Sequence, residues 1–451
     1  GKAVDRYEGP LKVTGTAPYA YEVQPPSPPA YGVMVGAAIA AGRISGVDIA
    51  EAEATPGVLV VWTHLNAPPQ APRGTKVHPR SSAGSRPALE SDRVFFFGQP
   101  VALVVGETLE AATAGAHRVK LTYAADTPDV NFAASLDRAV SPSGEEDVEV
   151  GDFVRGFTSS PVQVDETWET PIQNHCQMEP CASTVWFEDG KCIAHTSIQM
   201  VKPAQHGLAE TLGIPRDDVH LLTRYIGGGF GGKGQTYDDL ILAALAAKAL
   251  GRPVKVAYTR QQMMHGTIHR PATVMQVRLG AEPDGRLNAF SMMTWTHCHR
   301  EGNFTEHASN FARALYAAPN RLTGHRLVKL DLPGAGPMRA PGEASGTLAL
   351  ECAMDELAEK LGLDPVELRI RNEPETDPEN GRPFSMRQLV RCLREGAQQF
   401  GWERRLPTPG LVRDGRWLVG MGMAAAIRGN FLLPAKCSFT VDAEGVITVR
   451  Q

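Results

Sequence analysis

The stretch GGGFGGKG at residues 227–234 is the part of this sequence whose residue types could hold a ligand with bare backbone. It contains six glycines and a single aromatic residue, Phe230. Glycines let backbone amides approach an anionic group closely, and a helix that starts just after them adds positive potential at that point. A ring with glycines on both sides can form the wall of such a site, or it can fill the core at a tight turn.

Two nucleotide-binding motifs fit parts of this loop. Gly227, Gly232 and Lys233 match most of a triphosphate-binding loop, but Gly234 stands where that motif needs a Ser or Thr to bind magnesium. The glycines also match G-x-G-x-x-G, yet no acidic residue follows at the distance that ribose binding requires. A nucleotide-binding enzyme that uses the Gly227–Lys233 loop is therefore kept as the weaker alternative.

The segments around the loop predict the elements that would position it. Residues 219–226 predict a strand, and residues 237–250 predict a helix. Further on, residues 347–362 place apolar side chains on one helical stripe and finish at a glycine that can end the helix. Asp364 then predicts the N-cap of another helix, with Pro365 at its first position.

Changes in composition divide the chain into four parts. Residues 1–130 alternate strand-like runs with turns, residues 131–150 form a polar linker, and residues 151–400 mix strands with helices. The last part, residues 401–451, stops inside or just after a strand, which predicts a domain that begins here and is truncated. Strand-like and helical segments thus both occur along the chain.

Composition and charge argue against several classes of protein. An apolar fraction of 42% is ordinary for a globular chain, and a net charge of −5 without a basic stripe argues against nucleic acid as a partner. No apolar run reaches membrane-spanning length, and the first residues lack the apolar region of a signal peptide. The seven cysteines are odd in number and form no C-x-x-C pair, which argues against a disulfide scaffold. His297 and His299 are expected to be ordinary strand residues rather than zinc ligands.

Several segments resemble, in order and spacing, the molybdenum hydroxylases, which are the xanthine oxidase family. GGGFGGK resembles the first molybdopterin-contacting loop of that family, and HTSIQ at residues 195–199 resembles the strand whose Gln approaches the metal. QNHCQMEP at residues 173–180 resembles the H-x-x-M-E-P segment, and PMRAPG at residues 337–342 resembles the R-x-P-G segment. Residues 6–108 resemble the a/b hammerhead domain. The chain is most similar to bacterial aldehyde-oxidising members, whose molybdenum subunit is a separate polypeptide.

This resemblance implies an α+β fold with mixed sheets and flanking helices, and it implies a domain organisation. Residues 1–130 would be the hammerhead domain, residues 131–150 a linker, and residues 151–400 the first part of the molybdopterin-binding domain. Residues 401–451 would be the truncated start of its second part. The catalytic Glu of the family is expected beyond residue 451, on the missing C-terminal part or on a polypeptide that supplies it.

The resemblance also implies a reaction and its cofactors. The chain would be the molybdenum-binding subunit of an oxidoreductase that hydroxylates aldehydes to carboxylic acids, or aromatic N-heterocycles, with oxygen from water. The implied cofactor is molybdenum–molybdopterin in its cytosine dinucleotide form. Clusters of the [2Fe-2S] type and FAD are expected on separate small and medium partner subunits. The implied compartment is the cytoplasm, or the periplasm if a partner with a signal carries the chain.

Particular residues receive roles through the same resemblance. Gln199, Phe230 and Arg339 would surround the molybdenum without ligating it. The cofactor contacts would come from Gln199, Gly228, Gly229, Phe230, Gly231, Arg339 and Ala340. The substrate pocket would be formed by Phe230, Gly234 and Arg428.

Two of the pocket residues carry information about the substrate. Purine-oxidising members have a Glu after GGGFGGK, so Gly234 favours an aldehyde or a plainer heterocycle. Arg428 is the only charged residue in VGMGMAAAIRGN, where it either orients substrate or is simply solvated. An inactive half-domain, or an assembly partner that needs a second polypeptide, is the other alternative function.

Overall fold

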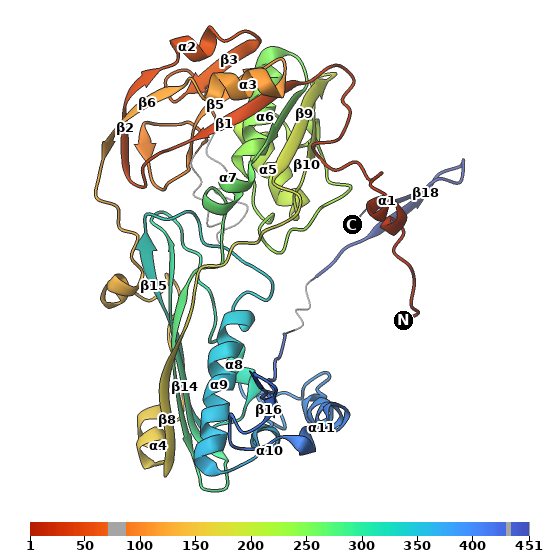
Figure 1. Cartoon of the computed structure of the whole chain (residues 1–451). Helices are drawn as coiled ribbons and strands as arrows, with labels where there is room; N and C mark the ends of the chain where they lie inside the picture. The colour runs from red at the N-terminus through yellow and green to blue at the C-terminus, as the bar shows by residue number, and fades with distance from the viewer. Residues whose placement is uncertain (71–86, 430–433, 451) are drawn as a thin grey trace.

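The structure is a computed structural model that describes residues 1–70, 87–429 and 434–450. It has two lobes joined by a narrow waist (Figure 1). The upper lobe contains a seven-stranded sheet and a three-stranded sheet, and the lower lobe contains a five-stranded sheet. Helices cover these sheets, which confirms the predicted α+β class with mixed sheets and flanking helices.

The seven-stranded sheet combines strands from both sides of the predicted linker. Its centre is the parallel pair β1 (Ala30–Gly36) and β12 (Val254–Ala257). Its order is β11-β10-β9-β12-β1-β5-β3, and its other strands are β3 (Val58–Thr63), β5 (Pro100–Gly106), β9 (Ala182–Glu188), β10 (Lys191–Thr196) and β11 (Val219–Leu222). The N-terminal part of the chain is thereby hydrogen-bonded into the same sheet that carries the glycine loop. The predicted domain boundaries remain predictions.

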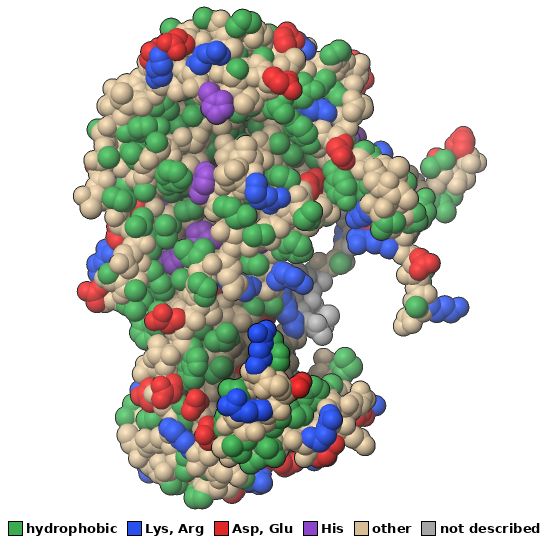
Figure 2. Space-filling view, in the orientation of Figure 1, with side chains coloured by type: hydrophobic (Ala, Val, Ile, Leu, Met, Phe, Trp, Pro, Cys, Tyr) green, Lys and Arg blue, Asp and Glu red, His purple; other side chains and the backbone are tan. Residues whose placement is uncertain are grey.

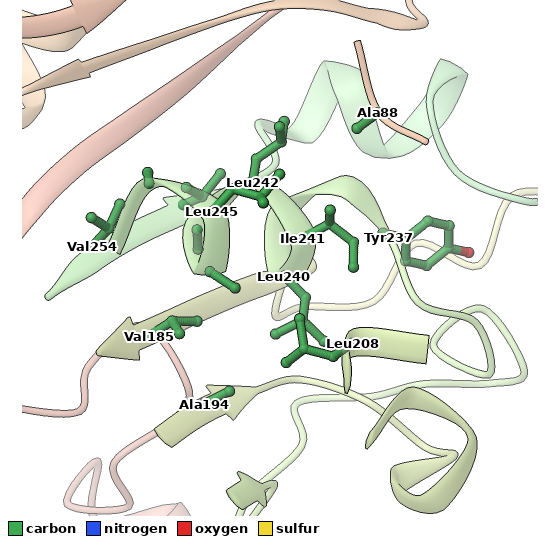
Figure 3. Close-up of a cluster of buried hydrophobic side chains, with 14 of the residues drawn as sticks. Ala88, Val185, Ala194, Leu208, Tyr237, Leu240, Ile241, Leu242, Leu245 and Val254 are labelled. Carbon is green, nitrogen blue, oxygen red and sulfur yellow. The ribbon is translucent and has the colours of Figure 1, made fainter. Parts of the chain in front are cut away.

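The main core of the upper lobe surrounds one helix, α6 (Asp238–Leu250), which packs on β9 and β12. Figure 3 shows its apolar side chains pointing into the cluster, and those of Leu240, Ile241 and Leu242 are essentially inaccessible to solvent. Burying each of these side chains contributes about 1.5–3 kcal/mol, so the helix is a firm anchor for the loop that precedes it. The predicted helix at residues 237–250 is confirmed. The predicted strand at 219–226 is shorter and ends at Leu222, because the glycine loop leaves the sheet there.

The five-stranded sheet of the lower lobe is covered on both faces. Its strand order is β7-β15-β14-β13-β8, with bounds β7 (Val148–Val150), β8 (Val162–Thr170), β13 (Thr273–Ala281), β14 (Leu287–His299) and β15 (Asn320–Leu330). The long helix α9 (Glu343–Leu361) lies on one face and α4 (Phe153–Ser159) on the other (Figure 1). Apolar side chains of α9 and the sheet form the second large core cluster.

The helix ends in the lower lobe follow their local sequence. Gly362 ends α9 with a φ of 64°, a conformation that glycine adopts without strain. Asp364 caps α10 (Pro365–Arg371) by accepting hydrogen bonds from the backbone N–H groups of Val366 and Glu367. Both helix boundaries that the sequence predicted are confirmed.

The remaining elements are shorter or lie at the surface. The last hairpin, β18 (Ser438–Val441) and β19 (Ile447–Arg450), projects away from the two lobes (Figure 1), and its apolar side chains are exposed. The short helix α1 (Gly9–Val13) likewise has no buried residue. The other described elements are β2 (Gly42–Asp48), β4 (Arg93–Val94), β6 (Lys120–Ala125), β16 (Arg413–Asp414), β17 (Trp417–Leu418), α2 (Ala50–Glu53), α3 (Leu109–Ala116), α5 (Val201–Leu212), α7 (Arg260–His265), α8 (Ala312–Leu315), α11 (Leu389–Phe400) and the 3-10 turns at 133–138, 216–218 and 402–404. Within the described ranges, every helix is too short or too polar to cross a bilayer.

Candidate active site

The glycine loop and Gln199 meet beyond the carboxyl ends of two parallel strands, β10 and β11. The side-chain oxygen Oε1 of Gln199 accepts hydrogen bonds from the N–H groups of Gly231 at 3.0 Å and Lys233 at 3.1 Å. The backbone N–H of Gln199 donates to the carbonyl of Lys233 at 2.7 Å. These three bonds fix the orientation of the amide. Its Nε2 group makes no hydrogen bond within the described chain and lies on the exposed side.

Phe230 projects from the loop instead of packing into the core. Its side chain is 40% exposed, and its φ of 54° is left-handed, which is unfavourable for a residue with a side chain. Gly228 lies against the ring, since a Cβ added there would stand 3.0 Å from a ring carbon. Such backbone strain persists only where the surrounding contacts impose it, and it occurs mostly at functional sites. The ring is therefore available as a wall of the site.

A second loop, residues 337–342, supports Phe230 from the lower lobe. The N–H of Arg339 donates to the carbonyl of Phe230 at 3.0 Å, and its guanidinium carbon lies 5.4 Å from the centre of the ring. Gly231 packs against the carbonyl of Pro337 so closely that no Cβ could fit between them. Ala340 also has a left-handed φ, 55°. Phe230 and Ala340, which both have left-handed backbones, thus lie on the two sides of the contact between the glycine loop and the 337–342 loop.

Two buried charged residues hold this second loop in place. Arg270 donates through Nη2 to the carbonyls of Met338 and Arg339, and Oε1 of Glu306 accepts the N–H of Gly342 at 2.7 Å. The Nε of Arg270 lies 3.5 Å from Oε1 of Glu306. Burial raises the pKa of Glu306 to about 7, against the lowering effects of the Gly342 N–H and the Arg270 charge. Sequence reasoning missed both residues, because no local pattern distinguishes them.

Lys233 is buried and paired, which argues against the nucleotide-binding alternative. Its Nζ lies 2.8 Å from Oε2 of Glu179, and the lysine side chain has no exposed surface. The same carboxylate oxygen accepts the N–H of Gly227 at 2.7 Å. A lysine that binds phosphate must reach the ligand, whereas this one holds the base of the loop together.

The QNHCQMEP segment supplies two further supports. The Nε2 of Gln177 donates to the carbonyl of Gly229 at 3.1 Å, and the Nε2 of His175 lies 2.8 Å from the carbonyl oxygen of Pro337. Burial lowers the pKa of His175, so the ring is neutral at pH 7 and carries its proton on Nε2 to make this bond. The His175 ring also packs against Gly232, where an added Cβ would overlap it, so His175 joins the 337–342 loop to the glycine loop. The sequence indicated this segment as part of the site but not these contacts.

Gly234 belongs to the glycine loop, whereas Arg428 lies in a separate segment of the chain. A Cβ at Gly234 would stand 3.2 Å from the carbonyl oxygen of Gly231 and 4.0 Å from a side-chain carbon of Met200. Arg428 lies outside any helix or strand, is 56% exposed, and pairs with Glu343 at 2.8 Å. It is therefore joined to the site through the first residue of α9 rather than through the glycine loop.

The donors that remain free suit an anionic, oxygen-rich cofactor. The N–H groups of Gly228, Gly229 and Phe230 donate to no acceptor in the described part of the chain. The Nε2 of Gln199 and the exposed guanidinium of Arg339 add further donors beside them. On the face shown in Figure 2, Lys and Arg side chains gather where the two lobes meet. The free N–H groups of the glycine loop, together with Gln199 and Arg339, fit a pterin cofactor that carries oxo and phosphate groups.

Metal ligands of the usual kind are not grouped here. No cluster of three or more His, Cys, Asp or Glu side chains able to hold a metal exists among the described residues. His297 and His299 are buried in β14, where His297 accepts the N–H of Ala272 at 3.1 Å.

Comparison with known families agrees with this geometry. Residues 137–373 match the molybdopterin cofactor-binding domain, and residues 14–127 match the aldehyde oxidase and xanthine dehydrogenase a/b hammerhead domain. The aldehyde oxidoreductase molybdenum-binding subunit PaoC of Escherichia coli O157:H7 is 46% identical over 453 residues, which covers 100% of this chain and 60% of PaoC. The aldehyde oxidoreductase of Megalodesulfovibrio gigas is 29% identical and is covered over 52% of its length.

Solved structures show the same architecture. The aldehyde oxidoreductase of Desulfovibrio gigas superimposes with a TM-score of 0.81 at 26% identity, covering 98% of this chain and 51% of that one. Quinoline 2-oxidoreductase of Pseudomonas putida 86, at 23% identity, shares the fold with a TM-score of 0.79. The chain spans about half to three fifths of the length of these relatives. It belongs to the molybdenum hydroxylases, the xanthine oxidase family, and carries the a/b hammerhead and molybdopterin-binding domains of their molybdenum-binding large subunit.

Proposed function

We propose that this chain is the molybdenum-binding part of an oxidoreductase that hydroxylates aldehydes to carboxylic acids, or aromatic N-heterocycles, with oxygen from water. The observation that carries this proposal is the fixed amide of Gln199 next to the exposed ring of Phe230. Two backbone N–H groups hold Oε1 of the amide, so Nε2 is directed away from the loop as a free donor. The 46% identity to a molybdenum-binding subunit of an aldehyde oxidoreductase supports the same reaction.

The chain's own residues would bind and orient the molybdenum cofactor. The free N–H groups of the glycine loop, the Nε2 of Gln199 and the Arg339 guanidinium would donate to its oxygen atoms. The bound cofactor would supply the oxygen transfer and accept the two electrons of the oxidation. Ala340, with its strained φ, would bring the backbone of the 337–342 loop close to the same ligand.

Phe230, Gly234 and Arg428 would shape the substrate pocket. The Phe230 ring would cover one side of the substrate and keep water away from the reacting carbon. Because Gly234 has no side chain, it provides no carboxylate for the N–H groups of a purine, which favours aldehydes. Arg428 would donate hydrogen bonds to an oxygen of the substrate.

Other components of the enzyme follow from the same proposal. The cofactor would be the cytosine dinucleotide form, and separate subunits would carry [2Fe-2S] clusters and FAD. The Glu that takes the proton would come from residues beyond 451 or from another polypeptide. The assembled enzyme would be cytoplasmic, or periplasmic if a partner directs its export, which fractionation of the native host would decide.

The variant Gln199→Glu tests the proposal because it separates two roles of one side chain. The carboxylate can still accept the N–H groups of Gly231 and Lys233, so the loop should keep its structure. The outward donor is lost, and turnover of aldehydes should fall roughly 100-fold in the purified native enzyme, as for loss of one preorganised donor. Molybdenum content per chain and the melting temperature are measured alongside. A wild-type enzyme that lacks molybdenum would overturn the proposal and favour the assembly-partner alternative.

The variant Gly234→Glu tests the class of substrate. A carboxylate at this position gives N-heterocycle N–H groups an acceptor, and it stays unpaired when an aldehyde binds. The ratio of kcat/KM for an aldehyde over a purine should fall, by up to roughly 10–200-fold. If both specificity constants stay unchanged, position 234 does not face the substrate.

A further inference from the structure

Segment 421–428, which carries Arg428, is attached to α9 at two points. The N–H of Ala425 donates to Oε2 of Glu351 at 2.6 Å, and the Nη1 of Arg428 donates to Oε2 of Glu343 at 2.8 Å. Eight residues of helix separate the two carboxylates, a rise of about 12 Å. Three residues of extended chain span about 10 Å, and the arginine side chain covers the rest. The segment therefore runs along α9 towards the N-terminus of the helix.

The attachment at Glu351 is rigid. Its carboxylate is buried and also accepts from the Nε of Arg369 at 2.8 Å and the hydroxyl of Tyr316 at 2.6 Å. Ala425 is itself buried in the core cluster of the lower lobe. A segment without regular secondary structure is thus held in one register along the helix. This register brings Arg428 to the first residue of α9.

The attachment at Glu343 leaves most of the Arg428 guanidinium free. A guanidinium has five N–H donors in one plane, and a single donor atom of Arg428 is bonded within the described residues. Its side chain is 56% exposed, while that of Glu343 is 20% exposed. The carboxylate holds one donor atom, so the remaining donors of the guanidinium can bond to a ligand.

Glu343 connects Arg428 to the 337–342 loop of the candidate active site. It directly follows the 337–342 loop, whose Arg339 is bonded to the carbonyl of Phe230. The charge of Glu343 also acts on Arg270 and Glu306, the two residues that hold that loop. Arg339 already places one cation near the ring of Phe230. The carboxylate of Glu343 offsets the charge of the second cation, Arg428, at the point where it approaches.

We propose that Glu343 is a positioning residue that holds Arg428 at the substrate entrance and reduces its net charge, so that the site favours neutral oxygen-bearing aldehydes over anionic ones. This inference rests on the proposed function. Its physical basis is that a paired guanidinium keeps its hydrogen-bond donors, whereas the neighbouring carboxylate repels a substrate carboxylate.

The first measurement needs no catalysis. Trypsin cleavage after Arg428 is compared between wild type and Glu343→Gln in the assembled enzyme. Cleavage should become at least several-fold faster in Glu343→Gln, because trypsin must bind the arginine side chain that Glu343 holds. Glu395→Gln is the matched control, since Glu395 forms an exposed ion pair with Arg391 on α11 at 2.7 Å. An unchanged rate of cleavage after Arg428 in Glu343→Gln would show that Glu343 does not position the segment.

The second measurement reads the substrate preference. Benzaldehyde, a formyl-benzamide and a formyl-benzoate with the same substitution pattern are compared by kcat/KM. Glu343→Gln should shift the benzoate-to-benzamide ratio about tenfold towards the anion, which corresponds to about 1.4 kcal/mol. In Arg428→Met, kcat/KM for the formyl-benzamide and for the formyl-benzoate should both fall towards the value for benzaldehyde. The fall should be roughly tenfold or more, because a hydrogen bond to a charged group is lost.

The outcomes separate this inference from the proposed function. If the wild-type enzyme oxidises all three aldehydes and neither variant changes their ratios, the inference is wrong and the proposed function stands. If the enzyme contains no molybdenum and oxidises no aldehyde, the proposed function and the substrate part of the inference both fail. The trypsin experiment then still decides whether Glu343 positions segment 421–428.

Discussion

The Nζ of Lys233 lies 2.8 Å from Oε2 of Glu179, and the lysine side chain is completely buried. The pair closes the base of the glycine loop, because the same oxygen also accepts the N–H of Gly227. A lysine in a glycine-rich sequence is thereby a structural residue of this loop rather than a phosphate ligand. The first prediction tests this relationship directly.

Lys233→Ala should destabilise the protein strongly, because it leaves the Glu179 carboxylate buried without its charge partner. Breaking such a pair from one side costs about 3–5 kcal/mol, whereas replacing both partners by apolar residues of similar size is much milder. In urea unfolding, Lys233→Ala and Glu179→Gln should each lower the free energy of unfolding more than the double variant Lys233→Met/Glu179→Leu does. Calorimetry of the wild type with ATP and magnesium should show no binding, and a specific nucleotide affinity would restore the nucleotide-binding alternative.

Phe230→Gly should reduce activity without reducing stability. The ring is 40% exposed, and glycine removes the cost of a left-handed backbone, about 1–2 kcal/mol. The melting temperature should therefore stay the same or rise, while aldehyde turnover falls. The control is Phe153→Ala, because Phe153 is 1% exposed and its removal should cost about 3–5 kcal/mol. A large loss of stability in Phe230→Gly would identify the ring as part of the core.

Gly231→Ala should separate the two loops, and Gly234→Ala should be mild. Gly231 has a φ of 99°, and an added Cβ would overlap the carbonyl oxygen of Pro337. At Gly234 the φ is not in the left-handed region, and the nearest atom to an added Cβ lies at 3.2 Å. In Gly231→Ala alone, the 337–342 loop should be cut faster in limited proteolysis and the melting temperature should fall. Equal behaviour of the two variants would contradict the close packing of Gly231 on Pro337.

Glu306 predicts a specific pH dependence of stability. Its pKa in the folded chain is about 7 against an ordinary value of 4.5, so the folded state binds the proton more tightly than the unfolded state. The stability that this proton contributes is complete below about pH 4.5 and is lost as the pH rises to about 7. The shift corresponds to a change on the order of 3 kcal/mol in the free energy of unfolding.

Glu306→Gln isolates this effect, because a neutral amide does not titrate. The free energy of unfolding of the variant minus that of the wild type should rise between pH 4.5 and 7. Taking the difference removes the contribution of buried histidines such as His269 and His325, whose pKa values burial lowers to about 3. Glu395→Gln serves as the exposed control and should give a flat difference. A flat difference for Glu306→Gln would mean that this carboxyl ionises normally.

Local sequence determined several of the elements around the candidate site. The stripe of α9, its end at Gly362 and the cap at Asp364 follow from interactions between residues a few positions apart. The glycine spacing around Phe230 likewise marked a place where bare backbone was needed. Such features depend on neighbours along the chain, so a single sequence is enough to predict them.

Only the tertiary structure decided which residues hold the site together. Arg270 contacts the carbonyl of Arg339 from 69 residues away, and Arg428 pairs with Glu343 across 85 residues. Neither partner has a local pattern that predicts the other, because the pairing depends on how α9 and the two lobes pack. The buried state of Lys233 is of the same kind, since it requires Glu179 from a separate segment. Sequence spacing therefore predicted the local elements and the glycine loop, while long-range packing decided which side chains are paired and which are free to bind a ligand.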